Sequence, residues 1–79
     1  MERKIKLIWE FYGPDAEQTA KHHKVHLEEF AKKENLILDI AGVEYVTEMK
    51  WLAYLICMES EMIKVRDAVK PLRGELFEE

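Results

Sequence analysis

The feature that most constrains this chain is a change of hydrophobic period near residue 13. Residues 4–12, KIKLIWEFY, alternate with period two and place every second side chain from Ile5 to Phe11 on one apolar face. The next residues, GPD, break the strand and suit a first helical turn. From Pro14 to about Glu34 the period becomes helical, and one stripe holds Ala16, Ala20, His23, Leu27 and Phe30. The pattern predicts a strand followed by an amphipathic helix.

The second half of the chain predicts two paired strands. Residues 34–46 are extended and rich in branched side chains, and Gly42 within them indicates a bulge or bend. TEMK, residues 47–50, is the predicted turn. Residues 51–58, WLAYLICM, carry apolar side chains on both faces, which is typical of a central strand.

A second helix and a short final strand complete the predicted order. Ser60 is a plausible N-cap, Met62, Val65 and Val69 give the buried stripe, and Pro71 ends the helix. Residues 72–79 can return as a strand. The order β-α-β-β-α-β predicts one α+β domain over residues 1–79, with the ferredoxin-like fold: an antiparallel sheet with two helices on one face.

Small size makes self-association an expectation. A chain of 79 residues is close to the lower limit for a self-sufficient core. Whichever set of residues 51–58 faces away from the helices is too apolar to leave in water. We therefore expect a homodimer through the sheet face, as in a dimeric α/β barrel.

Charge and cysteine content exclude several classes of protein. The formal net charge of −4 opposes binding to a nucleic-acid backbone. No segment is long enough to span a bilayer, and no signal peptide is expected, because only a short apolar run follows the first four residues. The single Cys57 rules out an intrachain disulfide, so a reducing cytoplasm is expected. No Gly-rich phosphate loop is present, and no cofactor is expected.

All three histidines lie between Ala20 and Phe30. His22 and His26 are four residues apart and share a helix side with Glu29, a spacing that can supply metal ligands. A stable zinc site usually needs three or four protein ligands, and a closed set is missing here. We therefore expect no metal site.

His23 and His26 are the candidates for proton transfer. At ~100° per residue, His23 lies about 20° from the centre of the buried stripe, His26 about 80° and His22 about 120°. We expect His23 to be a largely buried histidine at the core edge, His22 to be exposed, and His26 to border a pocket. A titrating histidine in a cleft is a reasonable general acid or base.

Residues 26–42, HLEEFAKKENLILDIAG, resemble the helix-to-strand signature of YCII-related proteins. The shared pattern is a His-Leu pair, an apolar residue three further on, and a Leu-rich strand ending at glycine. The preceding FYGPDA is similar to that family's strand-end turn, with Asp15 as its acidic residue. The resemblance implies a dimeric α/β barrel with a histidine and an aspartate near a pocket. Lys70-Pro71 and Val43 depart from the family pattern.

Two functions therefore compete. The first is a small-molecule enzyme or binder in which His26 or His23 moves protons, Asp15 orients them, and Trp9 or Tyr12 lines the site. With ~1.5 Å rise per residue, Asp15 and His26 lie about 16 Å apart on one helix, so a direct dyad within one chain is disfavoured. The second is a non-catalytic dimerisation or ligand-sensing domain with structural histidines. A histidine within hydrogen-bond reach of a carboxylate in a cleft would favour the enzyme.

Overall fold

The computed structural model describes residues 2–38 and 40–77 and contains four strands and two α-helices. No helix in these two ranges is long and apolar enough to cross a membrane. The elements follow one another in the predicted order. They are β1 (Lys4–Tyr12), α1 (Ala16–Lys33), β2 (Ile40–Thr47), β3 (Lys50–Met58), the 3-10 turn η1 (Glu59–Glu61), α2 (Met62–Val69) and β4 (Arg73–Phe77).

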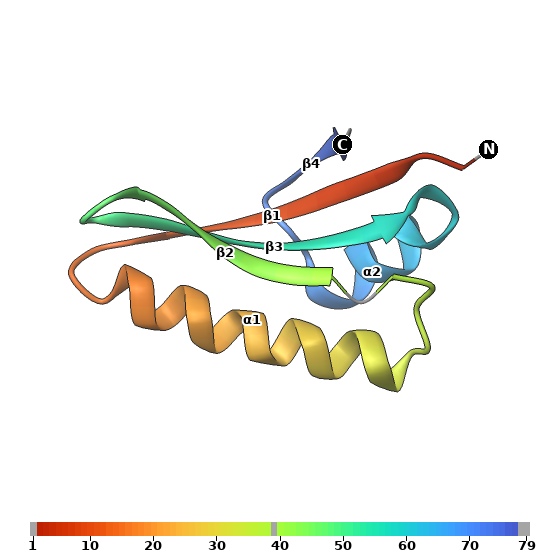
Figure 1. Cartoon of the computed structure of the whole chain (residues 1–79), viewed down its shortest axis with the longest axis horizontal. Helices are drawn as coiled ribbons and strands as arrows, with labels where there is room; N and C mark the ends of the chain where they lie inside the picture. The colour runs from red at the N-terminus through yellow and green to blue at the C-terminus, as the bar shows by residue number, and fades with distance from the viewer. Residues whose placement is uncertain (1, 39, 78–79) are drawn as a thin grey trace.

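The strands form one antiparallel sheet in the order β2-β3-β1-β4. Both helices lie on the same face of this sheet, with the long α1 running beneath β2 and β3 and the short α2 closer to β4 (Figure 1). The architecture is α+β and is compatible with the predicted ferredoxin-like arrangement.

The alternation in β1 separates the core from the opposite face as predicted. Ile5, Leu7 and Trp9 are buried in one hydrophobic core with side chains of β3, α1 and α2. The small buried residues Ala20 and Ala31 let α1 lie close to the sheet. Burial of this apolar surface, at roughly 25 cal/mol per Å², is the main term that holds the two layers together.

Local backbone chemistry sets the ends of α1. Gly13 has φ +108° and donates its N–H to the Met49 carbonyl, so the turn after β1 is held against the β2–β3 hairpin. At the other end Asn35 is left-handed, with φ 53°, and Leu36 donates its N–H to the Ala31 carbonyl. This is a Schellman arrangement, and the buried Leu36 side chain completes it.

The hairpin of β2 and β3 corrects two predictions. β2 begins at Ile40 rather than at residue 34, because residues 34–38 complete the helix end and a loop. The break in strand register lies between Tyr45 and Thr47, not at Gly42, which pairs regularly with Tyr54. Gly42 is needed for a different reason: a Cβ there would lie 2.6 Å from Cζ of the Tyr54 ring. The predicted turn at residues 47–50 is confirmed.

α2 differs from its prediction at its start. Ser60 lies inside η1, and the residue that precedes α2 is Glu61, without a side-chain cap. Val65 is fully buried as expected. The helix ends at Val69, and the left-handed φ of 46° at Lys70 turns the chain through Pro71 toward β4.

The central apolar side chains on the sheet face away from the helices are less exposed than expected. Ile8, Leu52 and Ile56 on this face are only 2%, 6% and 3% exposed in a single chain. Lys6 of β1 reaches across β3 to Glu44 of β2, 3.2 Å away, and its amino group lies over an aromatic ring of β3. Long charged side chains therefore cover much of this face, and dimerisation through it stays a prediction.

Candidate functional site

The candidate site is a pocket at the end of β1, which we call the His23 pocket. It has a volume of about 610 Å³. Three elements form it: the last residues of β1, the middle of α1, and the connector between α2 and β4. Its lining residues are Trp9, Glu10, Phe11, Tyr12, His23, Lys70, Pro71 and Leu72. Trp9 and Tyr12, which were predicted to line a site, both line this pocket.

His23 projects from α1 against the aromatic side chains of β1. Its ring centroid lies 4.9 Å from that of Trp9 and 5.4 Å from that of Phe11. Its Nε2 atom is buried and has no hydrogen-bond partner among the described residues. Burial lowers the pKa of the His23 imidazole, and His26 and His22 lower it further. The ring is therefore held neutral at neutral pH.

Polar groups lie around the aromatic wall of the pocket. The Trp9 indole donates to the Val69 carbonyl at 3.0 Å, which fixes the ring against the end of α2. On the other side of β1, the Glu10 carboxylate accepts hydrogen bonds from Tyr12 and Arg73, and Lys50 lies 3.5 Å away. The hydrogen bonds from Tyr12 and then Arg73 lower the pKa of Glu10. The pocket thus joins an apolar wall to a fixed, charged rim.

His22 and His26 lie on the exposed side of α1. Their Nε2 atoms are 3.0 Å apart, and His26 Nδ1 lies 3.5 Å from a Glu29 oxygen. The structure corrects the prediction for His26, whose side chain is 61% exposed and lines neither pocket described here. The His26 side chain turns back along the helix toward His22. Within residues 2–38 and 40–77, no three His, Cys, Asp or Glu side chains gather to hold a metal.

Asp15 is exposed at the start of α1 and does not contribute to the His23 pocket. Its carbonyl accepts from the Thr19 N–H and hydroxyl, and none of its contacts with described residues involves a histidine. Among the described residues, the carboxylate that pairs with a histidine is that of Glu29, on the solvent side of α1.

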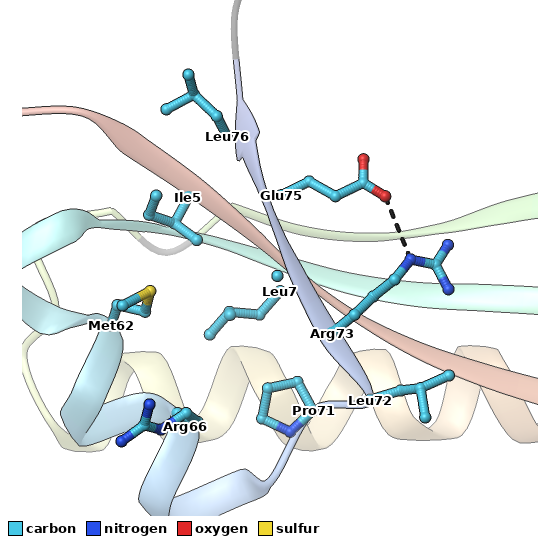
Figure 2. A pocket seen from close by; sticks show the side chains of 10 residues that line it. Ile5, Leu7, Met62, Arg66, Pro71, Leu72, Arg73, Glu75 and Leu76 are labelled. Carbon is cyan, nitrogen blue, oxygen red and sulfur yellow. Dashed lines mark hydrogen bonds and ion pairs between the residues drawn. The ribbon is translucent and has the colours of Figure 1, made fainter.

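A second pocket of about 340 Å³, the α2 pocket, lies on the other side of the α2–β4 connector. Figure 2 shows Ile5 and Leu7 of β1 and Met62 of α2 around it, with Arg73 paired to Glu75 at its rim. Its walls are mainly aliphatic, and no histidine, cysteine or aspartate is among the described residues that line it. It offers less specific chemistry than the His23 pocket.

Cys57 is fully buried in β3. Burial raises the pKa of its thiol to about 11, and Glu61 adds to the shift. A thiol of this kind is a packing group rather than a nucleophile.

Sequence reasoning missed Glu10 and Lys70 as parts of the site. Glu10 lies on the polar face of β1, and only the pairing of β1 with β4 brings Arg73 to it. Lys70 lines the pocket because its left-handed conformation turns the chain after α2. The Lys70-Pro71 pair marked the helix end in the sequence, but not a pocket wall.

The sequence matches no protein-family model, and it has no match among curated proteins or solved structures. The resemblance to YCII-related proteins stays a prediction. The geometry of the site alone therefore carries the functional argument.

Proposed function

We propose that this chain is a ligand-binding module, and that the His23 pocket is its binding site. The observation that carries the proposal is an imidazole in the wall of a pocket, whose Nε2 is buried in the free protein and has no hydrogen-bond partner among the described residues. A ligand that displaces the side chains covering this atom can supply the partner. An unsatisfied buried polar group typically lowers stability by about 1–3 kcal/mol, so a role in binding is a reason for its presence. The pocket volume is within the range usual for small-molecule sites, roughly 300–1,000 Å³.

Binding is better supported than acid–base catalysis. A histidine that transfers protons is usually oriented by a carboxylate, and no described carboxylate forms a hydrogen bond with His23. Glu10 lines the same pocket, but its carboxylate is bonded to Tyr12 and Arg73. His26 has Glu29 beside it, but the pair lies on an open helix surface. We further propose that the module works in the cytoplasm, because its single cysteine is a buried thiol.

The test compares two adjacent histidines. A library of small aromatic and amide-containing fragments is screened by ¹H–¹⁵N NMR against wild type, His23→Phe and His22→Phe. We expect fragments to shift the signals of Trp9 and His23, and to bind His23→Phe at least about fivefold more weakly, because one hydrogen bond is lost. His22 is exposed outside the pocket, so His22→Phe should bind like wild type. Hits that shift only α2-pocket residues would refute the proposal.

The homodimer through the sheet face is a separate proposal. What favours it is the apolar surface still open on that face, where Ile40 remains 47% exposed. The charged covering described above reduces this driving force, so any dimer should be weak.

A further inference from the structure

We propose that the His23 pocket binds an extended peptide segment, which adds a short strand to the free edge of β1. This inference rests on the proposed function of the pocket and names the chemical class of its ligand. It starts from a mismatch in length. β3 pairs with β1 as far as Tyr12, whereas β4 pairs with it only as far as Ile8. Beyond Ile8, β1 therefore has a neighbour on one side only.

The free edge presents main-chain hydrogen-bonding groups. In a strand, the N–H and C=O of one residue point to one side, and successive residues alternate. The Ile8 carbonyl accepts from Leu72 on the β4 side, while the Gly13 N–H bonds to Met49 on the β3 side. Glu10 and Tyr12 share the parity of Ile8, so their N–H and C=O groups face the pocket. No described residue bonds to these four groups.

Such a row of donors and acceptors is complementary to another extended main chain. Glu10 and Tyr12 are about 7 Å apart along the strand, which matches three residues of an added strand. β2 also has a free outer edge, but none of its residues lines either pocket. β4 has a free outer edge too and borders the α2 pocket, but the described lining of that pocket holds no aromatic ring. At the end of β1 the free edge meets a cavity walled by aromatic side chains and His23.

The two faces of the sheet predict the peptide's side-chain pattern. The peptide residue opposite Phe11 would project toward the helices and meet Phe11 and His23. Its neighbours would project to the other face, near the Glu10 carboxylate and Lys50. We therefore expect a large apolar or aromatic residue at the centre, flanked by polar residues.

A second copy of the chain fits this edge less well. If two β1 edges paired, the helix-facing side chains of the partner strand would be its own Trp9 and Phe11. These already pack in the core of their own chain. The apolar wall and His23 would stay unfilled, so a separate segment with a free central side chain is the better occupant.

The first experiment uses capped pentapeptides with Phe, Leu, Ser or Asp at the centre and degenerate polar flanks. Binding is followed by amide hydrogen exchange and ¹H–¹⁵N NMR. In the free protein the Glu10 and Tyr12 amides should exchange quickly, while those of Trp9 and Phe11, bonded to β3, should be protected. Peptide should protect Glu10 and Tyr12, and central Phe should bind at least about tenfold more tightly than central Ser, because an apolar side chain is buried.

Two controls isolate the main-chain contact. N-methylation of the peptide amides that face β1 should weaken binding about tenfold or more. On the protein side, Tyr12→Pro removes the free N–H and Tyr12→Ala serves as its reference, since both lose the same side chain. Tyr12→Pro should bind roughly three- to tenfold more weakly than Tyr12→Ala, the range expected for one hydrogen bond. If Tyr12→Pro does not fold, the N-methylated peptide still tests whether main-chain hydrogen bonds contribute to binding.

Equal binding of the N-methylated peptide would overturn the peptide proposal. Fragments that bind beside His23, with no peptide protecting Glu10 and Tyr12, would overturn it too and leave the binding module standing. Protection of these amides that rises with protein concentration alone would identify a second copy as the occupant. If the pocket bound neither fragments nor peptides, the proposed function itself would be refuted.

Discussion

Replacing His23 by phenylalanine should stabilise the protein. The substitution keeps an aromatic ring beside Trp9 and Phe11, and it removes the buried Nε2 that has no partner among described residues. Leaving such a group unsatisfied costs about 1–3 kcal/mol, and fitting a slightly larger ring recovers only part of this. We expect the free energy of unfolding to rise by about 1–2 kcal/mol at pH 7.5. For a domain of this size that is a gain in Tm of about 5–10 °C.

The same substitution should change the pH dependence of stability. The pKa of His23 is lowered from its ordinary value of 6.5 in the folded protein. The unfolded chain therefore binds more protons as pH falls below about 6.5, and wild-type stability declines there. His23→Phe removes this component, so its advantage over wild type should grow between pH 7.5 and pH 5, while other titrating groups cancel in the difference.

Urea unfolding followed by circular dichroism at pH 7.5 and pH 5 measures both effects. His23→Leu, which has a smaller side chain, controls for overpacking. A loss of more than about 1 kcal/mol in both variants would show that the imidazole has a favourable partner, and the reasoning would fail. An advantage that does not depend on pH would refute the lowered pKa.

Three further outcomes are expected. Gly42→Ala should lower the free energy of unfolding, measured by thermal melting, by about 1–3 kcal/mol, because the added Cβ displaces the Tyr54 ring. The loss should be smaller in a Tyr54→Leu background, and equal losses in the two backgrounds would contradict this explanation. Cys57, with its thiol pKa raised to about 11, should react with an aromatic disulfide at least about 100-fold more slowly in native protein than in urea, and a fast native reaction would count against its burial. Sedimentation at increasing concentration should approach twice the chain mass, whereas a strict monomer at about 100 μM would contradict the dimer.

Sequence periodicity predicted the layers but not the pocket. The alternation in β1 and the helical stripe of α1 reflect which side chains are buried, so the core face could be predicted. His23 lies on the sheet side of α1 as expected, but it is half-buried rather than largely buried. The exposure of His26 could not be predicted, because the angle of a residue around its helix does not show whether another part of the chain packs opposite it. The His23 pocket exists because β4 ends its pairing at Ile8, which is a matter of strand length and register. Similarly, Gly42 was identified as unusual, but only its pairing with Tyr54 explains it.

The charged covering of the open sheet face has a consequence for how ionic strength acts on the chain. Two ion pairs, Lys6 with Glu44 and Arg73 with Glu10, hold long side chains over the apolar residues of this face. Added salt weakens these ion pairs, because the screening length falls to about 10 Å or less. Screening frees these long side chains to move away from Ile8, while salting-out anions strengthen apolar association. Sulfate should therefore promote self-association of this acidic protein, and dilution of the salt should reverse it.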